Sequence, residues 1–376
     1  MKRANNAGQK KLFFTGGGTG GHIYPNLALA QDLREKHPDL KLAYLGSYGK
    51  LEEKLASGHD LQFIPIPFIG GMPRSLLALG WGMRLLMAIW KVFWLLRKDP
   101  PCLIFGTGGY SAAPVFAAAV LLKIPYIIHN LDTYIGLANQ LFIPCAAALT
   151  LGMPPTGHSG HYPQPKDGPV LVTGNPVRRE LLELKSNSEE IRARLGLKPD
   201  LPVLVVVGGS QGAQIINENF FAVVGDLLAE NWQIIHQLGE KQYATFEDRF
   251  PIHPSYKPYR YLEKIWEIYS VADLAVSRAG AMSLAELTTM SIPTLYIPLA
   301  SAAQNHQELN AKYISDRGAA EILVQKDLSP SNLKAKLKEL HNKRADISEK
   351  LKPLQENQSK ANNQLMKVVE SFRSRL

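Results

Sequence analysis

The stretch FFTGGGTGGHIYPNLALAQDL, residues 13–33, decides the fold class of this chain. It reads as the end of an apolar β-strand, a glycine-rich turn and a helix, which is how a βαβ unit begins. A second stretch with the same order, VVVGGSQGAQIINENFFAVV, occupies residues 205–224. Two such openings in one chain predict two Rossmann-like domains, a weak repeat of architecture rather than a repeat array.

Short apolar runs continue this pattern outward from both stretches. The first half carries KLFFT, LKLAYL, QFIPI, CLIFG, PYIIH, AALTL and VLVTG, and the second carries LPVLVVVGG, WQIIHQL, DLAVS, PTLYIPL and AEILV. Strands that alternate with helix-length segments indicate an α/β protein with parallel sheets. With a hinge near Asn175 and Pro176, we expect domains at residues 1–176 and 177–350 and a separate final helix within residues 351–376. That helix should be amphipathic, with one apolar side made of Leu365, Val368, Val369 and Phe372.

Composition limits the class of protein further. The 376 residues are 45% hydrophobic and 20% charged, which is typical of a globular chain long enough for two cores. Two cysteines, Cys102 and Cys145, exclude a disulfide framework or a cysteine-rich zinc site and favour a reducing cytosol. The net charge of +9 favours an acidic partner, such as a nucleotide, a nucleic acid or an anionic membrane.

Membrane association is predicted to be peripheral at most. The basic N-terminus lacks the apolar stretch of a signal peptide, so we expect no secretion. The most apolar segment, residues 75–96, is a poor span because Arg84 and Lys91 interrupt it. With Lys98 they form a cationic stripe on a helix rich in tryptophan and leucine, which is typical of a helix at a lipid interface. A core helix whose cations reach water is the alternative.

The first glycine-rich turn has the chemistry of an anion site. Gly16, Gly18 and Gly21 match the G-x-G-x-x-G pattern of dinucleotide-binding proteins, but the next strand ends in Leu-Gly-Ser without the acidic residue that holds an NAD ribose. Glycines let a ligand approach the N–H groups at a helix N-terminus, where anions are favoured. His22, at the mouth of the turn, could accept a proton near neutral pH. The plain alternative is a packing turn with an incidental histidine.

Three segments of the second half suit a nucleotide sugar. Residues 208–212 offer backbone amides and the Ser210 hydroxyl to phosphate, unless they form a simple tight turn. Residues 277–286 combine small residues with Glu286, whose carboxylate could accept hydrogen bonds from both ribose hydroxyls, although such a residue alone is more often a capping or solvated group. Residues 305–310 gather amide and imidazole groups that suit sugar hydroxyls, or form an ordinary polar loop.

Several other chemistries have no sequence signal. The chain contains no Asp-x-Asp, no H-E-x-x-H and no cysteine cluster, so we predict neither a metal site nor a cofactor. It also lacks G-x-S-x-G and the P-loop motif, which argues against hydrolase and P-loop proteins. A departing diphosphate would then be stabilised by protein amides and Arg178.

Seven motifs stand in order across about 300 residues. They are GGGTGGHIYPNLALA (16–30), TGGYSAAP (107–114), GLANQ (136–140), TGNPVR (173–178), GGSQGAQIIN (208–217), SRAGAMSLAE (277–286) and NHQELNA (305–311). Together they closely resemble the MurG family, glycosyltransferase family 28, over nearly the whole chain. Those enzymes move N-acetylglucosamine (GlcNAc) from UDP-GlcNAc to undecaprenyl-diphospho-N-acetylmuramyl-pentapeptide (lipid I), which makes lipid II for peptidoglycan.

The resemblance implies a GT-B fold, with two Rossmann-like domains facing a cleft. The N-terminal domain would bind acceptor and membrane, the C-terminal domain would bind UDP-GlcNAc, and the final helix would pack back on the first domain. It further implies an inverting enzyme, peripheral on the cytoplasmic face of the inner membrane, whose partners are UDP-GlcNAc, lipid I and an anionic membrane surface rather than nucleic acid.

The motifs also carry over site residues. His22 would be the catalytic base, and Thr19, Gly20 and Gly21 would reach the donor diphosphate or sugar. Arg178 and Ser210 would hold phosphate, and the Leu262 backbone would meet uracil. The nucleoside would be clasped by Ala281, Met282, Ser283, Leu284, Ala285 and Glu286. GlcNAc would contact His306 and Gln307, and Tyr110 and Asn217 also fall on family site positions.

One segment departs from the family pattern. Where the family usually has His-Glu-Gln-Asn before G-L-x-N, this chain has His129, Asn130, Leu131 and Asp132. The usual carboxylate is missing and another stands two positions later, so we expect Asp132 to be an alternative base or to orient His22. Three rival functions remain: a glycolipid synthase acting on diacylglycerol, a UDP-GlcNAc epimerase of the same fold, and a UDP-sugar-binding protein without catalysis.

Overall fold

The chain divides into two compact units, each with its own parallel sheet. In this computed structural model, unit 1 comprises Met1–Arg178 and Lys360–Leu376, and unit 2 comprises Arg179–Ser359. The structure describes residues 10–18, 20–59, 61–67, 70, 78–156, 162–183, 188–209 and 211–373. The chain thus passes between units after residues 178 and 359, whereas the sequence pattern predicts boundaries after residues 176 and 350.

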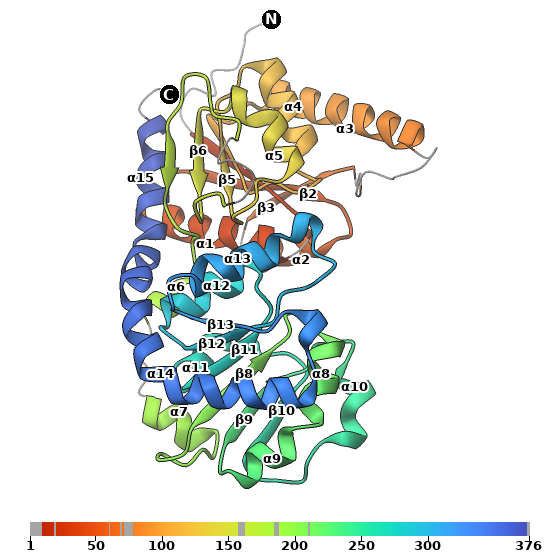
Figure 1. Ribbon diagram of the computed structural model, residues 1–376. Helices are drawn as coiled ribbons and strands as arrows, with labels where there is room; N and C mark the ends of the chain where they lie inside the picture. Colours follow the sequence, from red (N-terminus) through yellow and green to blue (C-terminus); the bar gives the residue numbers. More distant parts are fainter. Residues whose placement is uncertain are drawn as a thin grey trace, which may run out of the picture. The chain divides into compact units, whose positions relative to one another are not determined.

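Seven parallel strands form the sheet of unit 1, in the order β3-β2-β1-β4-β5-β6-β7 (Figure 1). Their bounds are β1 Lys11–Thr15, β2 Lys41–Ser47, β3 Gln62–Ile66, β4 Leu103–Gly106, β5 Tyr126–Asn130, β6 Ala148–Leu151 and β7 Val170–Val172. The central strands are apolar on both faces because helices cover both sides, as in doubly wound sheets. The strand order reverses between β1 and β4, where open α/β sheets bind ligands.

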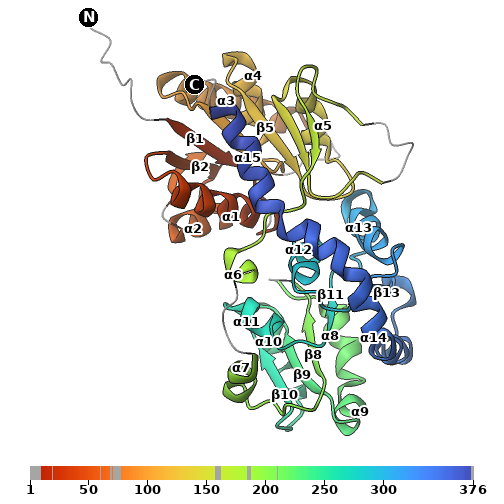
Figure 2. The same cartoon turned by 90° about the vertical axis from the view of Figure 1, so that its left-hand side faces the viewer.

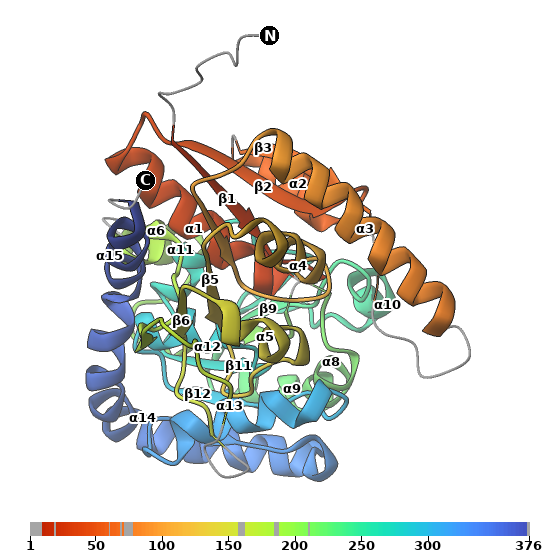
Figure 3. The ribbon, with the colours of Figure 1, turned by 90° about the horizontal axis from the view of Figure 1, so that it is seen from above.

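Helices cover the two faces of this sheet in two groups (Figure 3). One face packs against α1 (Gly20–Lys36), α2 (Leu51–Gly58) and α15 (Ala361–Arg373). The other packs against α3 (Ala78–Lys98), α4 (Ala113–Leu122), α5 (Leu137–Phe142) and the short 3-10 helix η1 (Ile143–Cys145). Leu365 and Val369 of α15 are buried in the first core, with Val368 and Phe372 packed beside them. The final helix therefore completes the core of unit 1.

Six parallel strands form the sheet of unit 2, in the order β10-β9-β8-β11-β12-β13. Their bounds are β8 Val203–Val207, β9 Gln233–Gln237, β10 Tyr256–Tyr259, β11 Leu274–Ser277, β12 Thr294–Tyr296 and β13 Glu321–Ile322. The order reverses between β8 and β11, so this sheet has its own ligand-binding edge.

The remaining helices surround this second sheet. They are α6 Arg179–Leu182, α7 Ser188–Arg194, α8 Gln214–Phe221, α9 Val224–Ala229, α10 Tyr243–Phe246, α11 Ile265–Tyr269, α12 Ala281–Thr289, α13 His306–Ser315 and α14 Pro330–Ser359, with 3-10 helices η3 Glu247–Arg249, η4 Ala303–Asn305 and η5 Gln325–Asp327. The long α14 lies against α8 and α12 (Figure 2) and buries Leu333, Leu337, Leu340, Ile347 and Leu351. Their helical spacing makes one apolar stripe.

The helix α3 has a buried face and an exposed apolar face. Ala88, Val92 and Leu96 are fully buried on the face of α3 that packs mainly against α4. The opposite face of α3 is exposed and carries an apolar stripe of Met83, Leu86, Met87, Trp90 and Trp94. Among the described residues, no helix combines the length and the apolar character needed to cross a bilayer.

Candidate active site

Two glycine-rich loops meet at the carboxyl edge of the unit 1 sheet. The first follows β1 and the second follows β4, the two strands between which the strand order reverses. A β-carbon on Gly16 would lie 2.1 Å from Oγ1 of Thr107, and one on Gly109 would lie 2.3 Å from the carbonyl oxygen of Gly17. Only glycine permits this backbone approach, and Gly16, Gly18 and Gly109 also have positive φ angles.

His22 lies in the first turn of α1, at the point where these loops meet. Its Nδ1 is 3.0 Å from the carbonyl oxygen of Thr107. A carbonyl oxygen only accepts, so this contact requires a proton on Nδ1 and favours the tautomer whose lone pair is on Nε2. The hydroxyl of Thr107 in turn donates to the His22 carbonyl at 2.6 Å. The two contacts with Thr107 therefore fix the orientation and the tautomer of His22.

Three buried residues that the sequence analysis did not identify support the first loop. The Tyr44 hydroxyl donates to the Gly16 carbonyl at 2.6 Å, and burial raises the pKa of Tyr44, so the phenol remains a donor. The Asn26 amide donates to the Thr15 carbonyl at 3.0 Å. The carboxylate of Glu52, a residue 2% exposed, accepts from the Gly18 N–H at 3.1 Å. The sequence does not identify these three residues as supports, because their contacts with the loop depend on tertiary packing.

Asp132 lies in the loop after β5, the neighbour of β4. Within this loop the Asn130 amide donates to the carbonyls of Asp132 at 2.7 Å and Tyr134 at 3.2 Å, and its oxygen accepts from Asn139 at 3.2 Å. Asn130, at the position where the family usually has glutamate, is thus used to build the loop. Asp132 is half-buried and Tyr110, after β4, is 52% exposed. Both belong to loops at the same sheet edge as His22.

His129, although beside this segment, is part of the core. It is fully buried, with Nδ1 3.0 Å from the Thr150 hydroxyl and Nε2 3.1 Å from Oδ1 of Asn175. Burial lowers its pKa to about 4, so the imidazole is neutral at neutral pH. His129 therefore connects β5 with β6 and with the segment that follows β7.

Arg178, in the segment after β7, places a cationic group of unit 1 beside α1. Its guanidinium lies 4.5 Å from the ring centroid of Tyr24 on α1, a stacking arrangement that holds a cation in a fixed place. Gly20 and Gly21 form the first two residues of α1, where N–H groups have no partner within the helix. Thr19 lies outside the described residues.

The corresponding edge of unit 2 carries a second glycine turn, residues 208–212 between β8 and α8. Gly209 and Gly212 have φ angles of 91° and 77°. A β-carbon on Gly208 would lie 2.5 Å from the Ala213 nitrogen, so the turn lies close to the start of α8. Ser210, the predicted phosphate ligand, lies outside the described residues.

The helix α12 begins at the same edge, directly after β11. Gly280 precedes it, and the side chains of Ala281, Leu284 and Ala285 are buried. Met282 and Ser283 are half-buried, and Glu286 is 7% exposed. The buried side chains of Ala281, Leu284 and Ala285 therefore fix the start of α12 in the core of unit 2.

Asn217, which falls on a family site position by resemblance, has a fully buried side chain. Its amide nitrogen donates to the Leu238 carbonyl at 3.1 Å, and its oxygen is 3.1 Å from Nε2 of His236. Burial lowers the pKa of His236 to about 3, which keeps this imidazole neutral and able to donate from Nε2. Asn217 therefore supports the loops around the turn.

His306 and Gln307 open α13, after β12. His306 Nδ1 is 2.8 Å from the Ala303 carbonyl, and Oε1 of Gln307 accepts from the Leu299 N–H at 3.0 Å. The two residues before them, Gln304 and Asn305, both have left-handed φ angles, of 51° and 54°. This conformation is costly for residues other than glycine and is common in ligand-binding loops.

Arg278 fixes the neighbouring strand ends. Its guanidinium donates to the carbonyls of Ile297 at 3.0 Å and Pro298 at 3.1 Å and to Oε1 of Gln325 at 3.1 Å. Burial lowers its pKa to about 10, which still leaves it charged at neutral pH. In the part of the chain that the structure describes, no group of three or more His, Cys, Asp or Glu side chains is arranged to hold a metal ion.

Family models match both units. Residues 12–150 match the glycosyltransferase family 28 N-terminal domain, and residues 203–367 match the family 28 C-terminal domain. The solved structure of MurG from Acinetobacter baumannii superposes with a TM-score of 0.73 at 25% identity, over 96% of this chain and 99% of that one. The predicted α/β GT-B fold is therefore confirmed.

Curated relatives match over most of their length. A UDP-N-acetylglucosamine–N-acetylmuramyl-(pentapeptide) pyrophosphoryl-undecaprenol N-acetylglucosamine transferase from Carboxydothermus hydrogenoformans is 35% identical over 93% of both chains. The transferase of the same name from Halothermothrix orenii is 38% identical over 88% of this chain and 90% of its own. This chain therefore belongs to the MurG family of glycosyltransferases, within glycosyltransferase family 28.

Proposed function

We propose that this protein is an inverting glycosyltransferase that moves GlcNAc from UDP-GlcNAc to undecaprenyl-diphospho-MurNAc-pentapeptide, giving lipid II. The observation that carries the proposal is His22, which a carbonyl contact of 3.0 Å holds in the tautomer of a base, at the ligand-binding edge of a family 28 fold. The names of the curated relatives supply the two substrates.

The donor is proposed to bind at the carboxyl edge of the unit 2 sheet. Backbone N–H groups of residues 208–212, with Ser210, would hold the diphosphate at the start of α8, where amides and the helix dipole favour an anion. The Leu262 backbone would meet uracil, and residues 281–286 with Glu286 would bind the nucleoside. His306 and Gln307 would contact GlcNAc, and Thr19, Gly20 and Gly21 would also reach the donor.

The chemical step is proposed as a direct displacement at the sugar. His22 Nε2, aided by Asp132, removes the proton from the MurNAc hydroxyl as its oxygen attacks the anomeric carbon of GlcNAc. The bond between that carbon and the diphosphate oxygen breaks, UDP leaves with the bonding electrons, and the anomeric configuration inverts. Arg178 and the helix N-terminal amides would stabilise the negative charge on the leaving diphosphate.

The helix α3 is proposed to dock the enzyme on the anionic cytoplasmic surface of the membrane that holds the acceptor. Trp90 and Met87 are 67% and 66% exposed, although burial of such side chains is favourable. Arg84, Lys91 and Lys98 lie beside this apolar stripe, and α3 contains no acidic residue. An apolar stripe with flanking cations is the pattern of a helix at an anionic lipid surface.

Transfer of labelled GlcNAc from UDP-GlcNAc to lipid I in detergent, with EDTA present, tests the activity. We expect a labelled disaccharide lipid from the wild type. His22→Ala should lower kcat by about 10²- to 10⁴-fold, the usual contribution of a general base. Asp132→Asn tests whether the altered loop assists His22, with a smaller loss expected.

The rival functions predict different results. Transfer to diacylglycerol but not to lipid I would indicate a glycolipid synthase, and turnover of UDP-GlcNAc without acceptor would indicate an epimerase. Bound UDP-GlcNAc without any turnover, unaffected by His22→Ala, would overturn the enzymatic proposal.

A further inference from the structure

One buried amide in unit 2 connects two loops that are far apart in sequence. Gln237, the last residue of β9, is 2% exposed. Its Nε2 donates to the carbonyl of Gly209 at 3.2 Å, and its Oε1 accepts from the backbone N–H of Leu262 at 2.9 Å. The two partners precede and follow Gln237 by 28 and 25 residues. A single side chain thus fixes main-chain groups on both of its sides.

The sheet order explains why this residue reaches both loops. β9 lies between β8 and β10, and all three strands are parallel. Their carboxyl ends therefore meet at one edge, where residues 208–212 follow β8 and Leu262 follows β10. The glutamine at the end of the middle strand is the residue from which a side chain can extend to both neighbours.

The Gly209 carbonyl needs such a partner if the turn is to bind an anion. Backbone N–H groups attract a diphosphate, whereas a carbonyl oxygen directed at it would repel it. In the structure this oxygen accepts from Nε2 of Gln237 and from the Gly212 N–H at 2.9 Å. Both contacts hold the carbonyl within the protein.

The same loops are also in direct backbone contact. A β-carbon on Gly212 would lie 1.9 Å from the Leu238 carbonyl oxygen, and one on Gly239 would lie 2.2 Å from the Gly212 nitrogen. The Asn217 amide donates to that Leu238 carbonyl at 3.1 Å. The segment after β9 is therefore pressed against the glycine turn, and Gln237 extends this contact to the segment after β10.

We propose that Gln237 is a positioning residue for the donor nucleotide, which pre-orders the diphosphate turn and the base-side segment as one unit. The inference rests on the proposed UDP-GlcNAc site and assigns it a residue that touches no ligand. Without this amide, both loops must be ordered when the nucleotide binds, and the apparent affinity falls with the fraction of the protein already in the binding conformation. The donor KM rises, while kcat and the acceptor KM do not.

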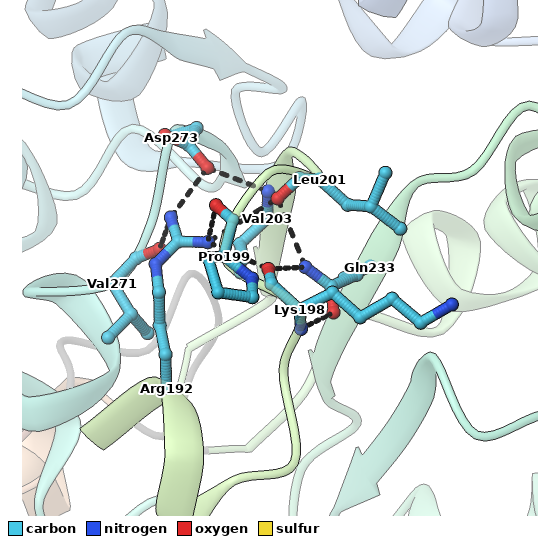
Figure 4. Close-up of polar contacts among 8 residues, drawn as sticks. All are labelled: Arg192, Lys198, Pro199, Leu201, Val203, Gln233, Val271 and Asp273. Carbon is cyan, nitrogen blue, oxygen red and sulfur yellow. Dashed lines mark hydrogen bonds and ion pairs between the residues drawn. The ribbon is translucent and has the colours of Figure 1, made fainter. Parts of the chain in front are cut away.

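The chain offers a matched control in the same strand. Gln233, at the other end of β9, is 1% exposed, and its amide also binds main-chain groups (Figure 4). Its Oε1 accepts from the Lys198 N–H at 2.6 Å, and its Nε2 donates to the carbonyls of Lys198 at 2.9 Å and Leu201 at 3.0 Å. These partners precede β8 and lie at the amino edge of the sheet. If the loss of UDP affinity only reflected a general disturbance of the fold, it should be similar when either glutamine is replaced.

The experiment compares Gln237→Ala with Gln233→Ala in the full-length protein. Calorimetry gives the Kd for UDP, and initial rates with each substrate varied give kcat and both KM values. We expect Gln237→Ala to raise the UDP Kd and the UDP-GlcNAc KM about ten-fold, the effect of losing one to two hydrogen bonds. Its kcat and lipid KM should stay within about two-fold, as should every binding parameter of Gln233→Ala.

Three results would overturn the proposal: an unchanged UDP Kd in Gln237→Ala, an equal rise in Gln233→Ala, or a fall in kcat with unchanged Kd and KM. If Gln237→Ala does not fold, Gln237→Glu takes its place in the test. This variant keeps an acceptor for the Leu262 N–H but removes the donor to the Gly209 carbonyl, so it should also weaken UDP binding. Normal UDP binding by the wild type without GlcNAc transfer would contradict the proposed function alone, since the UDP Kd values still test Gln237.

Discussion

At the residue scale, a buried carboxylate supports the loop that carries His22. Glu52 accepts a hydrogen bond from the Gly18 N–H at 3.1 Å, and a β-carbon on Gly17 would lie 1.9 Å from its Oε1. We expect Glu52→Ala to leave the Gly18 N–H without this partner, which should cost about 1–3 kcal/mol in the free energy of unfolding and lower kcat/KM about ten-fold. Urea unfolding and initial rates measure both effects.

The adjacent glutamate provides the control. Glu53 also accepts a backbone N–H, from Gly49 at 2.8 Å, but it does so at an exposed turn. Glu53→Ala should therefore change neither quantity appreciably. Glu52→Gln retains a carbonyl oxygen for Gly18 and should preserve most of the activity. An inactive but stable Glu52→Gln variant would show that the charge, rather than the hydrogen bond, is needed.

Two buried histidines predict how stability depends on pH. Burial lowers the pKa of His129 to about 4 and that of His236 to about 3, from 6.5. The unfolded chain therefore binds protons below pH 6.5 that the folded protein excludes. Their contribution to stability is complete above about pH 6.5 and is lost as the pH falls toward 4, by at most about 1.4 kcal/mol per pH unit for each histidine.

Urea unfolding between about pH 7.5 and pH 5 measures this dependence. The free energy of unfolding should fall with pH in the wild type, and less steeply in His236→Asn, which cannot titrate at this position. The same slope in both proteins would show that other groups produce the dependence.

At the scale of the element, the exposed apolar stripe of α3 predicts that this helix binds the membrane. Trp90 is 67% exposed, so Trp90→Glu should leave the fold intact. The substitution places a charge in the apolar stripe and should weaken binding to phosphatidylglycerol vesicles by about ten-fold or more. Sedimentation with vesicles measures the bound fraction, and activity on a short-chain, water-soluble acceptor should be retained.

The control for this prediction is an exposed apolar residue elsewhere. Ile252 is fully exposed in unit 2, and Ile252→Glu should bind vesicles like the wild type. Lys91→Gln should weaken binding to anionic vesicles but not to phosphatidylcholine, because it removes only charge. If Trp90→Glu and the wild type bind equally, α3 is not the docking surface.

The sequence predicts the helices and strands better than it predicts the contacts between them. The strand, glycine turn and helix at residues 13–33 and 205–224 are local patterns, so the loops around His22 and Gly209 could be predicted together with the strands that carry them. Gln237 and Thr107 could not be predicted as supports, because their partners are 25 or more residues away and depend on strand order. The burial of Asn217 could not be predicted for the same reason: the motif that contains it does not show which of its side chains are buried.

At the scale of the whole molecule, unit 1 is built from two separate parts of the chain. The last helix, α15, contributes Leu365 and Val369 to a core otherwise formed by residues of the first 150 positions, including Leu12, Phe14 and Leu27. The Asn362 side chain also accepts from the Val177 N–H at 3.0 Å and donates to Asp32 at 2.8 Å. The C-terminal residues therefore belong to the stability of unit 1, although unit 2 precedes them in the chain.

This arrangement predicts that one buried leucine in each long C-terminal helix reports on a different unit. Leu365 in α15 and Leu340 in α14 are both fully buried, in unit 1 and unit 2 respectively. Each leucine-to-alanine substitution should lower the free energy of unfolding by about 2–5 kcal/mol, the usual range for a core cavity.

Hydrogen exchange of the full-length protein should then quicken in β1 and β2 for Leu365→Ala and in β8 and β11 for Leu340→Ala. UDP affinity should stay near the wild-type value for Leu365→Ala, because most residues of the proposed nucleotide site belong to unit 2. Faster exchange across both sheets in either variant would mean that the two units unfold as one, and the assignment of α15 to the stability of unit 1 alone would be wrong.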